Sequence, residues 1–232
     1  MRPVRARRPA ASPGPSAGAG LCGIIVAVAV RTDRRIVAVD PAFGPLVAAV
    51  GPAPERAPVP AGDRFPALVS AVVSQLLSVA AARTIHARVV AACDGGVEPA
   101  SVLRVGAEGL RSVGLSRAKA ATLTDLADRV LGGAVRPAGH DDLDDAEVAA
   151  ELTAVPGIGP WTTHVYLIFS LARPDVWPVG DLGVRRGWGL VHHSPTAPTA
   201  RELATLGQPH AGHRSAVAWY CWQAVHRDRG DI

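Results

Sequence analysis

The chain has 232 residues, 48% of them hydrophobic and 19% charged, which is enough for one large or two small domains whose core needs no disulfide or metal. Its three cysteines, Cys22, Cys93 and Cys221, lie far apart. This spacing excludes a cysteine-held iron–sulfur cluster, which needs about four thiolates. No apolar stretch reaches the length of a membrane-spanning helix. We therefore expect a soluble protein of a reducing compartment, the cytoplasm.

The net charge of +4 is unevenly distributed along the chain. Residues 1–35 carry seven arginines and one aspartate, a charge of +6, so the remaining residues carry −2. Any binding of nucleic acid by the folded part must therefore depend on local clusters of basic residues. Lys119 is the single lysine among the 24 basic residues.

Residues 1–35 are expected to form a disordered basic tail with a short strand, because Arg, Pro, Ala and Gly dominate the first 20 positions. The apolar run 21–30 has the length of a signal-peptide core, and a wrongly assigned start codon would also explain the tail. The β-branched runs Gly23–Val30 and Ile36–Val39, on either side of a polar turn at 31–35, instead favour a short β-hairpin.

From residue 40 onward the pattern becomes helical. Apolar spacing predicts a helix or helix pair over 66–92, and a helix over 116–131 with Ser116 as its N-cap. A third helix begins at Asp144 or Asp145 and is stopped by Pro156-Gly157, a fourth covers 160–171, and a fifth covers 214–226. Because no repeat and no series of alternating strands is present, we expect a mainly α domain over residues 36–232.

The segment 152–171 predicts two helices joined by the tight turn Gly157-Ile158-Gly159. Glycine lets the backbone turn sharply and leaves no Cβ in the way of a ligand. The free N–H groups at the start of the second helix, with the positive end of its dipole, can bind a phosphate. An ordinary turn between packed helices has the same pattern, so the turn alone does not decide between the two.

Four sequence segments, taken in their order along the chain, help to decide between these two interpretations of the turn. They are SQLLSVAA at 74–81, GLSRAKA at 114–120, the hairpin followed by PVGDLGVRR at 178–186, and HRS…WYCW at 213–222. Together they resemble the helix-hairpin-helix DNA glycosylase superfamily, and within it the 3-methyladenine DNA glycosylase II branch, over residues 40–226. The resemblance implies two helical lobes with a DNA cleft between them, and a catalytic loop over 178–187.

Asp181 lies in this loop, directly before an expected helix. Most aspartates in such a place are N-caps. The resemblance implies a catalytic role as well, and the two roles are compatible, because the helix dipole favours an ionised carboxylate. Breaking an N-glycosidic bond develops positive charge on the sugar, which a nearby carboxylate stabilises.

Trp161 bears on the type of chemistry. Bifunctional members of the superfamily carry a lysine at the second position after the hairpin glycines, where it attacks the sugar. Trp161 occupies that position here, and an indole cannot act as this nucleophile. The resemblance thus implies a monofunctional enzyme that hydrolyses the bond to alkylated purines in double-stranded DNA and leaves the strand intact.

The remaining site residues follow from the same resemblance. Flipping a base out of DNA requires a wedge and a pocket. Leu76 matches the wedge position after Gln75, and the electron-rich ring of Trp222 matches a pocket aromatic that attracts a cationic base. Trp161 and Tyr220 are further pocket candidates, whereas we expect Trp219 in the core. The expected DNA contacts are Gln75, Leu76, Gly157, Ile158, Gly159, Thr162, Arg185 and Arg214, with Arg186 and Arg117 nearby.

The sequence departs from the family at His213, where an aromatic is usual, and at Val165 and Gly183, which suggest a roomier or differently selective pocket. A glycosylase for another damaged base and a non-catalytic helix-hairpin-helix DNA-binding module therefore stay open. No organic cofactor is expected, and the acidic run 141–145 is interpreted as a loop and cap instead of a metal site. We expect a monomer that associates with double-stranded DNA of the nucleoid and with no membrane.

Overall fold

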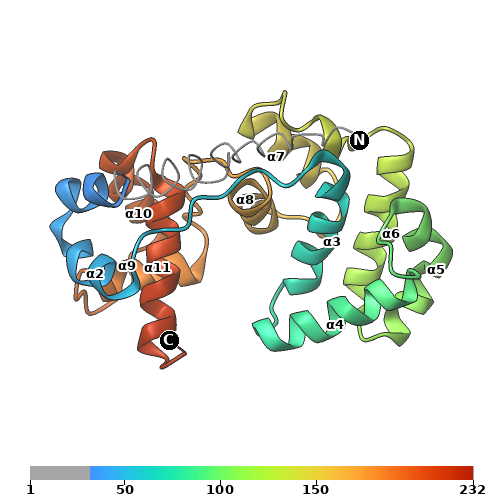
Figure 1. Ribbon diagram of the computed structural model, residues 1–232, viewed down its shortest axis with the longest axis horizontal. Coiled ribbons are helices and arrows are strands. Elements are labelled where there is room, and N and C mark those ends of the chain that lie inside the picture. The colour runs from blue at the N-terminus through green and yellow to red at the C-terminus, as the bar shows by residue number, and fades with distance from the viewer. Residues whose placement is uncertain (1–31, 232) are drawn as a thin grey trace, which may run out of the picture.

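The computed structural model describes residues 32–231, which form two helical lobes side by side (Figure 1). One lobe contains α3 (Arg64–Ser74), α4 (Val79–Ala92), α5 (Pro99–Ser112), α6 (Arg117–Leu131), α7 (Asp145–Thr153) and α8 (Pro160–Phe169). The other contains α2 (Gly44–Val50), α9 (Leu182–Val191), α10 (Ala200–Leu206) and α11 (Arg214–Asp228). Short 3-10 turns occupy Pro41–Phe43, Ala61–Asp63, Pro137–Gly139 and Gln208–His210. The mainly α, two-lobed architecture is confirmed, and no strand occurs among these described residues.

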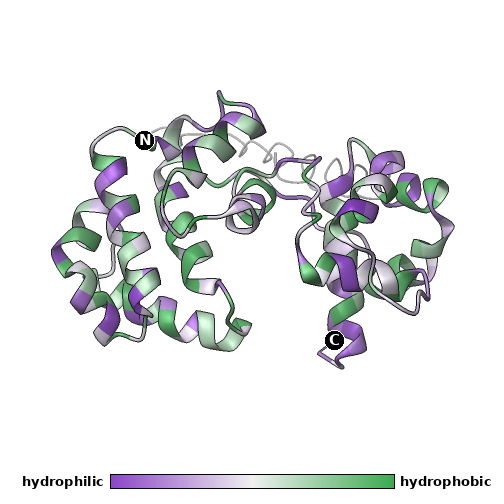
Figure 2. Ribbon diagram, turned by 180° about the vertical axis from the view of Figure 1, so that it is seen from behind, coloured by the Kyte–Doolittle hydropathy of each residue, from purple (hydrophilic) through white to green (hydrophobic). Residues whose placement is uncertain are grey.

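Each lobe has its own apolar core. The helices of both lobes carry apolar and polar residues side by side (Figure 2). Buried residues of α3–α8 form the first core, centred on side chains such as Leu68, Leu123 and Leu152. The second core combines the beginning and the end of the folded chain, because Ile36 and Phe43 pack with the tryptophans and Tyr220 of the C-terminal helices. Trp222 contacts both cores.

The expected β-hairpin is wrong in its second half, because residues 32–39 are helical. Its first strand, 23–30, lies outside the described residues. The packed part of the chain also includes residues before 36. Asp33 is buried, and its carboxylate accepts hydrogen bonds from the hydroxyl of Tyr220 (2.7 Å) and the N–H of Ala53 (3.3 Å). Packing in the second core therefore overrides the β-branched composition of this segment.

Capping explains most of the helix starts. Ser116 accepts from the N–H of Lys119, as expected, and Asp144 caps α7 in a reciprocal capping box with Glu147. The range 66–92 is a pair of helices, α3 and α4, separated by the α3–α4 loop (residues 75–78). The helices α5 and α10 were not expected, although both begin with a capping box.

No helix among residues 32–231 is both long and apolar enough to cross a bilayer.

The hairpin between α7 and α8 depends on Gly157. Its φ of +91° is a left-handed conformation that other residues adopt only under strain, and a Cβ there would lie 2.0 Å from Oγ1 of Thr122. That hydroxyl donates to the carbonyl of Pro156 and so anchors the turn on α6. The hairpin is therefore held against α6 by the side chain of Thr122, which leaves no room for a side chain at position 157.

We predict that Gly157→Ala lowers the free energy of unfolding by about 1–3 kcal/mol, because the added methyl both strains φ and overlaps Thr122. The matched control is Gly159→Ala, where no atom lies within 4 Å of the added Cβ and φ is −106°. Its loss should stay below about 1 kcal/mol, the usual difference between capping residues. Urea unfolding of both variants measures the difference, and equal losses would contradict this account.

Candidate active site

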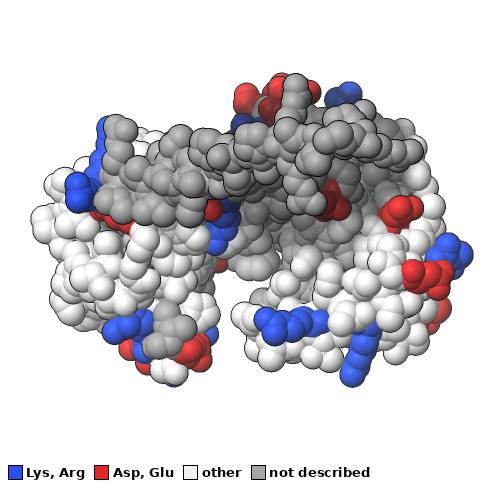
Figure 3. All heavy atoms as spheres, in the orientation of Figure 1, with Lys and Arg blue, Asp and Glu red and all other residues white. Residues whose placement is uncertain are grey.

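The residues singled out in the hairpin, the α3–α4 loop and the aspartate loop meet at one cavity of about 720 Å³ between the lobes. Its lining comprises Gln75, Leu76, Gly157, Gly159, Trp161, Thr162, Asp181, Leu182, Gly183, Arg186, Val225 and Arg229. Figure 3 shows a hollow between the two lobes, with basic side chains near its rims. A volume of this size can hold a base together with its sugar.

Asp181 lies at the centre of the hydrogen bonds in this cavity. It is 7% exposed and caps α9, with Oδ1 accepting from the N–H of Val184 at 2.7 Å. The same oxygen accepts from Nε1 of Trp222 at 3.1 Å, and Oδ2 accepts from Nε1 of Trp161. The carboxylate is thus both the predicted N-cap and a group oriented by two indoles, one from α8 and one from α11.

The indoles of Trp161 and Trp222 differ in their surroundings. Trp161 is 38% exposed and presents its ring to the cavity. Trp222 is partly buried and stacks on Phe169, with ring centroids 5.6 Å apart and an angle of 29° between the planes. Arg56 lies over the other ring of this stack, 4.6 Å from the centroid of Phe169. The stack fixes the plane of Trp222, so that its N–H points at Asp181.

Gly183 brings Trp222 close to Asp181. A Cβ at position 183 would lie 2.9 Å from Cδ1 of Trp222 and 3.0 Å from Oδ1 of Asp181. The space that a larger residue would fill is therefore occupied by the indole. The first alternative for Gly183, a roomier pocket, does not fit this contact, since the missing side chain allows a close approach of α9 and α11; the second, a differently selective pocket, stays a prediction.

Burial changes the pKa values of two side chains near Asp181, His164 and Cys221. Desolvation lowers the pKa of His164 on α8, while the negative charge of Asp181 acts in the opposite direction. The neutral imidazole is therefore favoured near neutral pH. Burial also raises the pKa of the Cys221 thiol, to which the charge of Asp181 contributes. Asp181 is the acidic residue of the cavity lining, and Arg186 and Arg229 are its basic residues.

The α3–α4 loop joins the hairpin through Gln75. Its side-chain amide donates to the carbonyl of Gly157 at 3.0 Å and to Oγ1 of Thr162 at 2.8 Å. Leu76 follows with a φ of +56° and a fully exposed side chain. An exposed leucine in a strained conformation at the edge of a cavity contributes nothing to a core, which agrees with the predicted wedge position.

Several predicted site residues lie elsewhere. Tyr220 does not line the cavity: it is fully buried in the second core and its hydroxyl contacts Asp33, Gly51 and Ala53. Ile158 is buried in the first core, and its N–H donates to the carbonyl of Val155. Arg185 donates to the carbonyl of Pro198, and Arg214 pairs with Asp175. These two arginines do not belong to the cavity lining, whereas Arg186 does.

Val225 and Arg229 were missed by the sequence analysis. They follow Trp222 at intervals of three and seven residues, Val225 on α11 and Arg229 as its C-cap, so a helical repeat counted from Trp222 would have found them. Leu182 was also missed as a lining residue; it follows Asp181 directly and is largely exposed.

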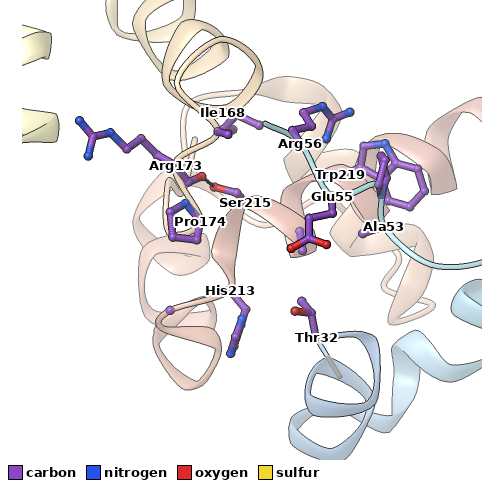
Figure 4. Close-up of a pocket in the computed structure, with 14 residues that line it drawn as sticks. Thr32, Ala53, Glu55, Arg56, Ile168, Arg173, Pro174, His213, Ser215 and Trp219 are labelled. Carbon is purple, nitrogen blue, oxygen red and sulfur yellow. Dashed lines mark hydrogen bonds between the residues drawn. The ribbon is translucent and has the colours of Figure 1, made fainter. Parts of the chain in front are cut away.

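A second cavity, of about 330 Å³, lies beyond the end of α8 (Figure 4). Arg56, Arg173, His213 and Trp219 line it. Trp219, three residues before Trp222 on α11, is half-buried and lines this second cavity and not the one that contains Asp181. Among the described residues no group of three or more acidic, histidine or cysteine side chains is placed to hold a metal ion.

Comparison with known proteins identifies the family. Residues 69–209 match the HhH-GPD superfamily of base excision DNA repair proteins. The chain belongs to this family. A DNA-3-methyladenine glycosylase 1 from Schizosaccharomyces pombe is 32% identical over 164 residues, which cover 69% of this chain and 72% of the relative. The predicted resemblance is therefore confirmed.

Solved structures agree with this assignment. The S. pombe 3-methyladenine DNA glycosylase in complex with abasic DNA superposes with a TM-score of 0.77 at 30% identity, covering 83% of this chain and 95% of that one. A DNA-3-methyladenine glycosidase from Bacillus halodurans superposes with a TM-score of 0.70 at 28% identity, covering 87% and 92%. Each of the two superpositions covers more than four fifths of this HhH-GPD protein.

We predict that Gly183→Ala displaces the indole of Trp222 from Asp181, because the added Cβ cannot stay 2.9 Å from Cδ1. With the five tryptophans labelled with nitrogen-15, the indole N–H signals of Trp222 and Trp161 should shift, since both donate to the same carboxylate. Gly180→Ala is the control, because no atom lies within 4 Å of its added Cβ. An unchanged Trp222 signal in Gly183→Ala would refute the close contact.

Proposed function

We propose that this HhH-GPD protein is a monofunctional DNA glycosylase that hydrolyses the N-glycosidic bond of alkylated purines of the 3-methyladenine type in double-stranded DNA. The observation that carries the proposal is the carboxylate of Asp181, buried and held by two indole N–H groups in the wall of a cavity shared by the hairpin and Leu76. The named relatives are 3-methyladenine glycosylases, which supports the choice of substrate class.

Each part of the cavity fits one requirement of this reaction. The purine must leave the base stack, and Leu76 is placed to fill the gap. An alkylated purine is cationic, and the face of Trp161, which lines the cavity, attracts cations by up to about 2 kcal/mol when desolvated. Trp222 does not line the cavity and contributes instead through its N–H, which donates to Asp181. The hairpin, with its free N–H groups at Trp161 and Thr162, suits a phosphate of the DNA backbone. Binding of the substrate in the cavity between the lobes therefore brings the sugar of the damaged nucleotide next to Asp181.

The chemistry needs a fixed negative charge more than a proton donor. As the bond from C1′ to the base nitrogen breaks, its electrons leave with the already cationic base, and positive charge develops on the sugar. The carboxylate of Asp181 stabilises that charge, and a water molecule then adds to C1′ and loses a proton. The products are the free base and an abasic site, with both phosphodiester bonds intact. Such an enzyme would act on the DNA of the nucleoid in the cytoplasm.

We predict that Asp181→Asn slows release of free base from methylated duplex DNA by about 100-fold or more, the usual cost of removing a charge-stabilising group. Asparagine is an equally good N-cap, so the fold should be retained. The control is Asp125→Asn, which removes an acidic residue paired with Arg129 on the surface of α6. Chromatography of the released base gives the rates.

Three results would contradict the proposal. An Asp181→Asn variant as active as the wild type would show that the carboxylate of Asp181 is not needed for the reaction. A wild-type protein that binds abasic DNA but releases no methylated base would place the substrate class elsewhere, and a panel of deaminated and oxidised bases would then separate another glycosylase from a binding module. A protein that binds no DNA would exclude both.

We predict that borohydride traps no covalent adduct between the protein and DNA, and that strands break only after alkali. Trp161 cannot form a Schiff base, and the single lysine, Lys119, donates to two backbone carbonyls of the first lobe. Gel electrophoresis, with a Schiff-base-forming glycosylase as the positive control, reads out both events. A trapped adduct that disappears in Lys119→Met would show that the enzyme has lyase chemistry after all.

A further inference from the structure

Lys119 lies at the start of α6, and its ammonium contacts the end of α3. Nζ donates to the carbonyl of Val73 at 2.8 Å and to the carbonyl of Gln75 at 2.6 Å. The last carbonyls of a helix have no intrahelical partner, and a cation there also interacts favourably with the helix dipole. One side chain therefore closes α3 and fixes the peptide group that leads into Leu76.

The α3–α4 loop is held from two sides. The side chain of Gln75 donates to the hairpin, at Gly157 and Thr162, while the backbone of Gln75 accepts from Lys119. Between these contacts and α4, the backbone of Leu76 adopts a φ of +56° and its side chain is fully exposed. In Figure 1 this loop lies below α3, on the side of the first lobe that is nearer to the second lobe.

We propose that Lys119 is a positioning residue for Leu76: by donating to the carbonyls of Val73 and Gln75, it holds the loop in the strained conformation that presents Leu76 to DNA. This inference rests on the wedge role of Leu76 in the proposed function. It also explains why a lysine stands at the beginning of α6, far from Asp181, in a chain whose other 23 basic residues are arginines.

The geometry favours an ammonium at this place. An ammonium is a compact donor on a flexible stem and can serve two carbonyls that lie close together, whereas a guanidinium requires a planar fork of acceptors. The half-buried Lys119 makes both bonds from α6, a helix that packs against α3 in the first core. The two hydrogen bonds of Lys119 therefore fix the α3–α4 loop to the packed helices of the first lobe.

The test measures insertion of Leu76 directly. A duplex carries an abasic site opposite a fluorescent adenine analogue, whose emission rises when a wedge unstacks it. The full-length wild-type chain should raise the emission, and Lys119→Met should bind the same duplex but unstack the analogue about tenfold less at equal occupancy, given the loss of two charge-assisted hydrogen bonds. Arg129→Met, which removes a basic residue elsewhere on α6, should behave as the wild type.

A double-mutant cycle separates positioning from a general structural effect. If Lys119 acts through Leu76, Leu76→Ala and Leu76→Ala/Lys119→Met should unstack the analogue equally little. In base release, Lys119→Met should be slowed about tenfold on a paired alkylated purine, yet remain within about twofold of wild type when the purine is already unpaired in a bulge. Thermal unfolding verifies the fold of each variant. Lys119→Gln, which retains an amide donor, replaces Lys119→Met if that variant fails to fold.

The outcomes are distinct from those of the proposed function. Wild-type unstacking without base release would refute the glycosylase proposal and leave the role of Lys119 standing. Full unstacking by a folded Lys119→Met variant, or additive effects of the two substitutions, would overturn the positioning role.

Discussion

The carboxylate of Asp181 connects helices from three parts of the chain. It caps α9 through Val184 and accepts the indole N–H groups of Trp161 at the start of α8 and Trp222 on α11. Because the acceptor is ionised, these are charge-assisted hydrogen bonds, which are about twice as strong as neutral ones. This one group therefore links the three helices at the wall of the cavity. A change at Asp181 therefore affects both the reaction and the arrangement of the aromatic rings around it.

This arrangement is possible because the two lobes are built from different stretches of the chain. Residues 32–53 pack with the C-terminal helices and complete the second core, where Tyr220 and Asp33 form a buried hydrogen bond; the chain then runs to the first lobe before α3. The first core consists of the continuous segment from α3 to α8. Asp181 follows the return from the first lobe to the second, so it lies at the boundary. A residue at a boundary can meet donors from both sides, which a residue inside either core cannot.

Much of this site could be predicted from the sequence, because its elements carry local chemistry. Ser116 and Asp144 mark helix starts, Gly157 marks the hairpin turn, and Asp181 stands before α9 as an N-cap that also faces the cavity. The order of four segments then indicated the family. These predictions succeed since each depends on neighbours only a few residues away.

The wrong predictions concern contacts that only the tertiary structure creates. Ile36–Val39 has the composition of a strand, but Ile36 is buried in the second core and the segment is helical. Tyr220 resembles a pocket residue by type, yet it lies two positions before Trp222 on α11, and residues two apart point to different faces of a helix. The glycine at position 183 suggests extra space in the pocket, but the indole of Trp222 occupies the space beside it. In each case the deciding partner is more than 35 positions away in the chain or on another face of the same helix.

Leu76 shows how function and stability separate in this fold. A leucine with a φ of +56° is strained by about 1–2 kcal/mol, and full exposure returns none of the free energy that burial of its side chain would supply. Such a conformation persists only where its surroundings determine it strongly. Gln75 and Lys119 provide those surroundings: Lys119 donates to two backbone carbonyls, and Gln75 donates to the carbonyl of Gly157 and to the hydroxyl of Thr162. The first lobe thus presents one residue that its own stability does not require, and the cavity that contains Asp181 begins beside it.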